Sequence, residues 1–513
     1  MHHLLGAALP SVLRVWGEVR ALHHDPGPDD SVAAALAGAA KLDALELTTN
    51  QSLWRNESCS WAGARTAVTQ HERLSVVVFG GSVTAGCGAA YPSLKCNSLT
   101  SWTRMLHDNL VAELGRNIEV QVWGKNAIRA SYFTQCTSEK LPENTNVVLL
   151  ELQPNLWVHG QLRCSYCAQY LEEVIDHVRR AAPRAAIALI GWPIQDLRPE
   201  RIESVIRQVA VGRGIDAWFA SPWTHHPALA GFLSSRNISM GDGLPGLRAD
   251  PVHPNMLGHA LLANGASRLI MERLRERPRC EGVASPHPSQ PNVQEWCYLS
   301  ADQIPLRSTS SAKVGKSPTN PPGLADGRGN ANGGRLGWSL VDEGGSKGVK
   351  KLGFLSTLEY GSPLILGPLP RCSELFLSLG VLQSWRTDFG ALSVGCTGPC
   401  ICAPLPCAFT DRCASKSIIV QTSSARRRYG SGRVELENAT ITVTHSLKVL
   451  TPNYMNLSLG NSSCYLKVAH VATHILPAPP SKHTRVRVDS LALQALSLQA
   501  QGPQRQSQCN ELR

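Results

Sequence analysis

SVVVFGGSVTAG, residues 75–86, is the stretch that decides the fold. It begins with an apolar run rich in β-branched side chains, which predicts a buried strand. Gly80 and Gly81 then permit a tight turn, and Ser82 follows directly. A serine at the carboxyl end of a buried strand lies where α/β proteins place their chemistry. If a helix starts there, its first free N–H groups lie beside the hydroxyl, where they can stabilise an oxyanion.

Strands and helices alternate around this stretch across residues 72–275. Further strands are expected at 118–123, 146–152 and 186–191, and helices at 102–114, 170–182, 202–211 and 255–274. Alternation at this spacing predicts an α/β fold, in which a parallel sheet is covered by helices on both faces. We expect this domain to span residues 71–278.

The rest of the chain differs in composition. Residues 1–70 are interpreted as an N-terminal extension, with an Ala-rich helix at 31–45 and a Trp-containing segment at 50–67 that packs against the α/β domain. Residues 279–335 are rich in Pro, Ser and Gly, which indicates a linker. Period-two runs at 336–495 predict an antiparallel β-sandwich, and 496–513 is interpreted as a polar tail.

The bulk composition narrows the class of protein. The chain has 513 residues, a net charge of +11 and 43% hydrophobic residues, so it is long enough for two or three globular domains. Its basic residues are scattered and no nucleic-acid motif accompanies them, so no nucleic-acid partner is expected. No run approaches 18 apolar residues, so no transmembrane segment is expected either.

Cysteines and sequons indicate the compartment. The chain holds 16 cysteines and six Asn-X-Ser/Thr sequons, which lie at Asn50, Asn56, Asn237, Asn438, Asn456 and Asn461. This combination favours a glycoprotein of the secretory pathway or the extracellular space, with disulfides. The N-terminus has only a short apolar patch without a basic start, which predicts a signal peptide that is weak or missing.

A base for Ser82 has to come from elsewhere in the chain. Without one, the turn fits a serine that merely caps a helix. Asp250 and His253 stand just before the last expected helix and can point to a common spot. His253 can take the proton of Ser82 while Asp250 orients the imidazole. The alternative is a helix-capping aspartate beside a surface histidine.

Asn155 supplies a third element of this set. It lies just past the strand expected at 146–152, at the edge where the loops gather. Its side-chain amide can donate a hydrogen bond to an oxyanion. The alternative is an ordinary turn residue after Pro154.

Taken in order, these motifs resemble the SGNH, or GDSL-type, hydrolases. That family carries Gly-Asp-Ser-X-X-X-Gly, then a Gly, then Gly-X-Asn-Asp and finally Asp-X-X-His. Here FGGSVTAG, ELQPN and DPVHPN follow the same order over roughly residues 72–275. The resemblance implies that Ser82 is the nucleophile, His253 the general base and Asp250 its partner. It implies no metal and no organic cofactor.

The resemblance also implies an oxyanion hole, and here the chain departs from the family. The backbone N–H of Ser82 and the amide of Asn155 would line it. The stretch that matches the family's glycine block is NAIRAS, residues 126–131, so Ala130 or Ser131 would have to donate instead. Gly81 replaces the family's Asp, as in algal and plant-like members with a following β domain.

The implied function is a serine esterase that hydrolyses an acyl ester, with an O-acetyl ester on a polysaccharide as the suggested substrate. Two alternatives stay open: an O-acyltransferase with the same triad, and an inactive glycan-binding or structural protein. Cys87, close to Ser82, is interpreted as half of a disulfide rather than a nucleophile. A redox or zinc role for Cys164 and Cys167 is disfavoured, because no second pair accompanies them.

Overall fold

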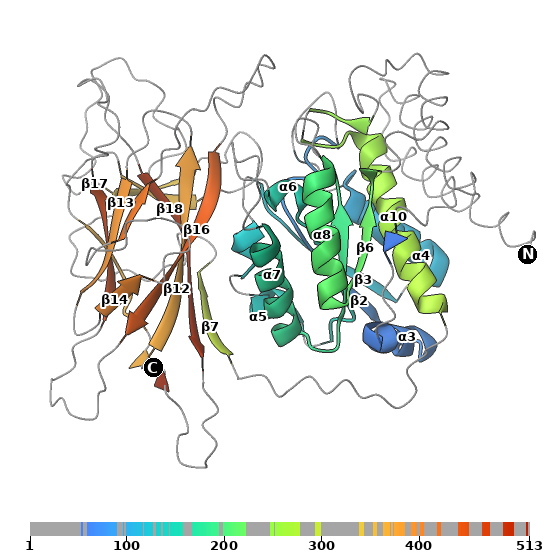
Figure 1. Cartoon of the computed structure of the whole chain (residues 1–513), viewed down its shortest axis with the longest axis horizontal. Helices are drawn as coiled ribbons and strands as arrows, with labels where there is room; N and C mark the ends of the chain where they lie inside the picture. The colour runs from blue at the N-terminus through green and yellow to red at the C-terminus, as the bar shows by residue number, and fades with distance from the viewer. Residues whose placement is uncertain are drawn as a thin grey trace, which may run out of the picture. The chain divides into compact units, whose positions relative to one another are not determined.

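The computed structural model divides the chain into two compact units, residues 1–287 and 288–513. It describes residues 53–54, 59–89, 96, 99–115, 117–126, 130–134, 137–142, 144–156, 167–193, 199–221, 247–250, 252–276, 293–298, 338–342, 352–356, 363–369, 371–372, 374–384, 391–397, 401–404, 418–421, 440–450, 464–471, 486–496 and 509–510. The helix expected at 31–45 and all six sequons lie outside these residues. Figure 1 shows the elements of each unit.

The first unit is built on a six-stranded sheet with the strand order β1-β6-β5-β4-β2-β3. Its strands are β1 (Leu53–Trp54), β2 (Leu74–Gly80), β3 (Ile118–Gly124), β4 (Val147–Glu151), β5 (Ala186–Gly191) and β6 (Asp216–Phe219). Strands β2 to β6 are parallel, and only β1 runs antiparallel. The chain leaves β2 towards β3 and then crosses to β4 on the other side. The carboxyl ends of β2 and β4 therefore flank the switch point at which such sheets bind ligands.

Helices cover both faces of this sheet (Figure 1). One face carries α3 (Ala62–Thr69), α4 (Trp102–Leu114) and α10 (Met256–Arg275), and the other carries α7 (Cys167–Ala181) and α8 (Pro199–Arg213). All of β2 is buried, and its Val76 and Val78 pack in one apolar cluster with Leu106 of α4 and Leu262 of α10. This confirms the expected three-layer α/β fold.

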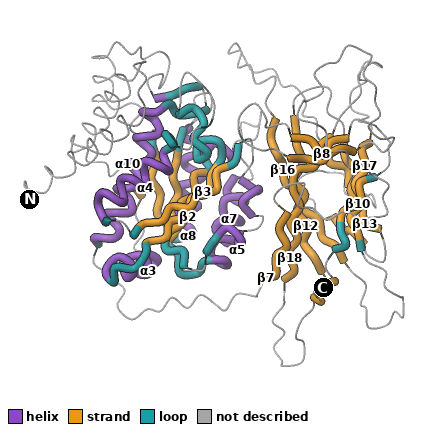
Figure 2. The backbone as a smooth tube through the Cα atoms, turned by 180° about the vertical axis from the view of Figure 1, so that it is seen from behind, coloured by secondary structure: helices purple, strands orange, loops and turns teal. Residues whose placement is uncertain are grey.

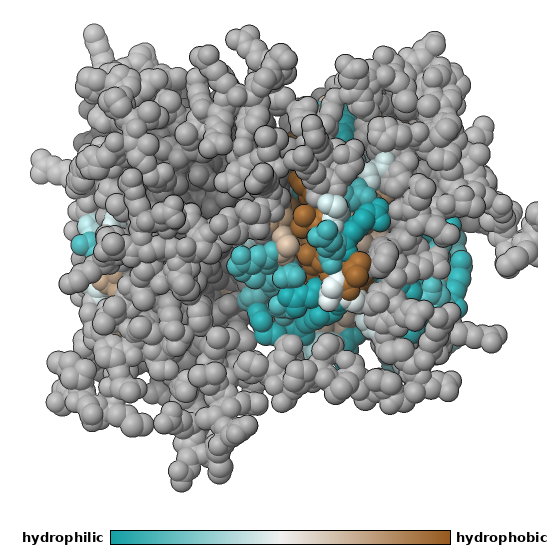
Figure 3. Space-filling model, in the orientation of Figure 1, coloured by the Kyte–Doolittle hydropathy of each residue, from teal (hydrophilic) through white to brown (hydrophobic). Residues whose placement is uncertain are grey.

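The outer surface of the helical layer formed by α7 and α8 is mainly polar where the structure describes it. Figure 3 shows hydrophilic side chains over much of the described part of α7 and α8, with a smaller hydrophobic area beside them. Helix α7 buries Leu171, Val174, Ile175 and Val178 and turns its polar side outward. This is the amphipathic pattern from which a helix at 170–182 was expected.

The second unit consists of antiparallel sheets, as expected (Figure 2). The larger contains β14 (Ile401–Pro404), β16 (Thr440–Leu450), β12 (Glu374–Ser384), β18 (Val486–Leu496), β9 (Leu352–Ser356) and β8 (Trp338–Asp342), with β7 (Val293–Tyr298) paired to β18. The smaller contains β10 (Leu364–Leu366), β17 (Tyr465–Val471), β13 (Ala391–Thr397) and β15 (Ile418–Gln421). The two sheets lie opposite each other in Figure 2.

Three boundaries differ from the expected ones. Strand β7 lies inside the supposed linker 279–335 and pairs with β18. Its sequence VQEWCY contains Val, Trp and Tyr, residue types that favour strands. Within the supposed tail 496–513, β19 (Cys509–Asn510) pairs with β11 (Arg371–Cys372). Within the supposed extension 1–70, β1 and α3 belong to the first unit, since β1 pairs with β6 and α3 contacts β2. The expected packing of this segment is therefore observed.

Candidate active site

Ser82 lies in a turn at the carboxyl end of β2, between the end of that strand and the end of β4. Three backbone hydrogen bonds close the turn, from Ala85 N to Gly81 O (3.0 Å), from Gly86 N to Val83 O (3.0 Å) and from Cys87 N to Ser82 O (2.9 Å). The chain forms a turn here and not the start of a regular helix. Ser82 is partly exposed, while its neighbours Gly81 and Val83 are buried.

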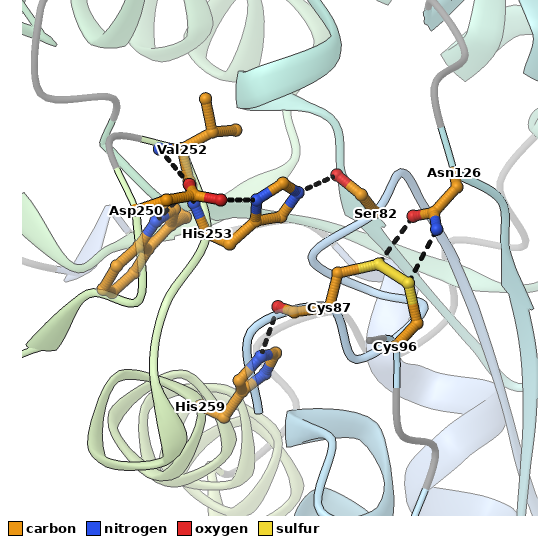
Figure 4. Close-up of polar contacts among 9 residues, drawn as sticks. Ser82, Cys87, Cys96, Asn126, Asp250, Val252, His253 and His259 are labelled. Atoms are coloured by element: carbon orange, nitrogen blue, oxygen red, sulfur yellow. Dashed lines mark hydrogen bonds and ion pairs between the residues drawn. A yellow bond between two sulfur atoms is a disulfide. The ribbon is translucent and has the colours of Figure 1, made fainter. Parts of the chain in front are cut away.

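The structure brings Ser82, His253 and Asp250 together in one row (Figure 4). Ser82 Oγ lies 2.7 Å from His253 Nε2, and His253 Nδ1 lies 2.6 Å from Asp250 Oδ2. With Nδ1–H donating to the carboxylate, Nε2 is free of hydrogen and accepts from the serine hydroxyl. This is the arrangement in which a serine can lose its proton to a histidine.

Asp250 is held in place by its own loop. Its Oδ1 accepts hydrogen bonds from the backbone N–H groups of Val252 and His253, each at 2.7 Å. Burial raises the pKa of Asp250, but the hydrogen bonds and the charge of His253 outweigh burial and leave the pKa below its ordinary value. The carboxyl group is therefore ionised at neutral pH and can stabilise a positively charged imidazole.

The loop that carries Asp250 and His253 is tied to the sheet and to α10. Trp192 Nε1 donates to Val252 O (3.0 Å), and the backbone N–H of Ala249 donates to His253 O (2.9 Å). The cap of α10 is Asn255, whose Oδ1 accepts from Gly258 N at 3.1 Å. Asp250 does not cap this helix, so the alternative interpretation of this motif is not what the structure shows.

Asn155 lies against the serine turn from the side of β4. It belongs to the single turn α6 (Gln153–Leu156), which directly follows β4. A Cβ atom added to Gly81 would overlap the carboxamide of Asn155. Glycine at position 81 therefore allows the close approach of Asn155, and an aspartate there would collide with it.

Ala130 is the third residue expected in the oxyanion hole. It is buried and is the first residue of the 3-10 helix η2 (Ala130–Thr134). Residues 127–129 before it are outside the described part of the chain. Its role as a donor remains a prediction.

Two contacts that hold the serine loop, residues 82–87, could not be predicted from the sequence. Cys87 forms a disulfide with Cys96, and the carboxamide of Asn126 lies 2.6 Å from both sulfur atoms (Figure 4). The sequence indicated that Cys87 is disulfide-bonded but not its partner. The second support is His259 of α10, which faces Cys87 O at 3.2 Å through Nε2.

His259 is a neutral linker and not a second base. Its Nδ1 accepts from the backbone N–H of Trp102 (3.2 Å), so Nε2 carries the hydrogen and donates to Cys87 O. Burial, helped by the charge of His253, lowers the pKa of His259 to about 4 against the raising effect of the hydrogen bond to the Cys87 carbonyl. His259 thus joins the serine loop to the N-terminus of α4 without carrying charge.

Comparisons with known proteins find solved structures of low similarity, several of which are described as esterases. No protein-family model and no curated protein matches the chain. Among solved structures, a two-domain esterase active on acetylated mannans is 11% identical with a TM-score of 0.47, over 84% of this chain and 94% of that one. The carbohydrate acetylesterase Est24 from Sinorhizobium meliloti is 14% identical with a TM-score of 0.30, over 39% and 99%. An aryl esterase from M. smegmatis is 15% identical with a TM-score of 0.28, over 39% and 99%.

At these sequence identities, the chemistry of the site has to follow from the side chains of the chain itself.

Of the cysteines outside the serine loop, Cys167, Cys297 and Cys396 are disulfide-bonded, while Cys164 lies outside the described residues. Among the described helices, none is long and apolar enough to cross a membrane.

Proposed function

We propose that this chain is an SGNH-type serine esterase that hydrolyses acyl esters, with Ser82, His253 and Asp250 as its triad. The observation that carries the proposal is the 2.7 Å contact between Ser82 Oγ and His253 Nε2, backed by Asp250 at 2.6 Å. Serine is a weak nucleophile unless a neighbouring base removes its proton, and this contact supplies that base. The side chains of His253 and Asp250 are 23% and 24% exposed, so substrate can approach them.

The reaction follows from these positions. Ser82 Oγ attacks the ester carbonyl carbon while His253 Nε2 takes its proton, and Asp250 stabilises the imidazolium. The N–H of Ser82, the amide of Asn155 and the N–H of Ala130 would donate to the oxyanion. His253 then protonates the alcohol oxygen, the alcohol departs, and Ser82 remains acylated. Water attacks the acyl carbonyl carbon while His253 Nε2 takes its proton. His253 then returns this proton to Ser82 Oγ as the bond between Oγ and the acyl carbon breaks, and the carboxylic acid departs.

For the substrate, we propose an acetyl ester on a polysaccharide. An acetyl group is small enough for a site in which Asn155 crowds the turn of Ser82, and the antiparallel unit offers a second domain that could hold a glycan. The two-domain esterase of similar fold is described as active on acetylated mannans, so acetylated mannan is the first polysaccharide to test. The disulfides support the proposal of an oxidising compartment.

Neither alternative is favoured by the geometry. An inactive binding protein needs no hydrogen bond between Ser82 and His253, yet Ser82 Oγ lies 2.7 Å from His253 Nε2. An acyltransferase has to exclude water from its acyl-enzyme, whereas Ser82 and His253 are partly exposed here. Hydrolysis therefore has the better support.

Acetate release tests the proposal. We expect the full chain to release acetate from acetylated mannan and from 4-nitrophenyl acetate, and the Ser82→Ala variant to release none above the uncatalysed rate. Transfer of the acetyl group to an added sugar, in place of release to water, would identify an acyltransferase. A folded wild type that binds mannan and releases no acetate from either ester would favour the binding protein.

A further inference from the structure

We propose that Thr84 and Glu151 form a positioning pair that holds the Ser82 turn in its reactive shape. This inference rests on the proposed function and goes beyond the triad and the oxyanion hole. Thr84 Oγ1 donates a hydrogen bond to Glu151 Oε2 at 3.0 Å, although 67 residues separate the two in the sequence. Both side chains are buried and neither contributes to the triad.

The pair joins the two strand ends that flank the site. Gly80 is the last residue of β2, and its register partner in the sheet is Glu151, the last residue of β4. A Cβ atom on Gly80 would collide with the side chain of Thr84. The turn therefore folds Thr84 back beneath the end of its own strand, where it meets Glu151.

The turn is thus held at two places, by one residue at the end of β4 and by one in α6, which directly follows that strand. The carboxamide of Asn155 lies against Gly81, just before Ser82, and Glu151 binds Thr84, just after it. Between these two contacts the chain has little freedom to rotate. These two contacts therefore set the direction of the Ser82 N–H, which would face the oxyanion. They also set the direction of Ser82 Oγ.

Glu151 is bound as a neutral acid. It is completely buried, and burial raises its pKa to about 8 against the opposing effect of the Thr84 hydroxyl and N–H. Among the described residues, Thr84 is the group that hydrogen-bonds its carboxyl, and Oε1 has no partner there. A neutral amide can accept the same hydrogen bond, so glutamine should replace Glu151 in this role while leucine should not.

The test measures kcat, KM and the rate at which a fluorophosphonate labels Ser82 in the full chain. We expect Thr84→Val, which keeps the shape and loses the hydroxyl, to lower kcat and the labelling rate about 10- to 100-fold with KM nearly unchanged. Thr84→Ser and Glu151→Gln should stay within about threefold of wild type, because both keep the hydrogen bond. Glu151→Leu should match Thr84→Val, and the double variant should lose no more than either single one, as expected of a unit.

Thr145→Val is the matched control. Thr145 is also buried and donates to Pro142 O at 2.6 Å, but it lies near the opposite end of β4. The Thr145→Val variant should lower the thermal unfolding midpoint about as much as Thr84→Val does, without changing kcat. Equal rates in Thr84→Val and wild type, or a loss in Thr145→Val as large as in Thr84→Val, overturns the positioning role. A wild type with no esterase activity and no labelling overturns the proposed function instead, and this inference with it.

Discussion

Replacing His253 with alanine is expected to lower the turnover of an acyl ester by roughly 10⁴-fold, with little change in KM. His253 Nε2 is the acceptor that lies 2.7 Å from Ser82 Oγ, so its loss leaves the serine without a base. The substrate is still bound by other groups, and therefore the effect falls on kcat. Steady-state hydrolysis of 4-nitrophenyl acetate by wild type and variant measures it.

His107→Ala is the control for this variant. His107 also contacts an aspartate, since its Nδ1 lies 2.9 Å from Asp108 Oδ1, and its side chain is 32% exposed, but it belongs to α4 and not to the serine site. We expect its turnover to equal that of wild type within about twofold. A His253→Ala enzyme that keeps more than a tenth of wild-type turnover would show that His253 is not the base.

Replacing Asp216 with alanine is expected to destabilise the first unit by about 3–5 kcal/mol. Asp216 starts β6 and is fully buried, where it pairs with Arg273 of α10 and accepts a hydrogen bond from Trp61 Nε1 at 2.6 Å. The variant leaves the buried guanidinium without this carboxylate and the indole N–H without its acceptor. Urea unfolding, followed by circular dichroism, measures the loss.

The matched control is Arg268→Ala on the same helix. Arg268 Nε pairs with Glu272 at 2.7 Å, but its side chain is 50% exposed. An exposed pair of this kind contributes less than about 1 kcal/mol, so we expect a small effect. The account of Asp216 is contradicted if its alanine variant is no less stable than Arg268→Ala.

The sequence predicted the elements whose signals are local. The β-branched run before Ser82 forms β2, the helical spacing at 102–114 forms α4, and 186–191 forms β5. The ordered motifs also identified Ser82, Asp250 and His253, which the structure brings into contact. These features are visible because period, turn residues and motif order can all be read along the chain.

Contacts between distant segments could not be predicted in this way. Strand β6 has only four residues, too few to show a period, and its Asp216 finds Trp61 and Arg273 only in the folded chain. The pairing of Thr84 with Glu151 likewise depends on how β2 and β4 align. The one available signal for Glu151 was a carboxyl group at the end of an otherwise apolar strand, where an unpaired charge is costly.

The most direct test of the central claim is labelling of the purified chain with a fluorophosphonate, followed by mass spectrometry of the modified peptide. An activated serine reacts with this reagent because a neighbouring base raises its nucleophilicity. We expect one modification, on Ser82, that disappears in Ser82→Ala and falls to background in His253→Ala. A folded wild type that remains unlabelled, or a label on Ser82 that persists in His253→Ala, would contradict a serine activated by His253.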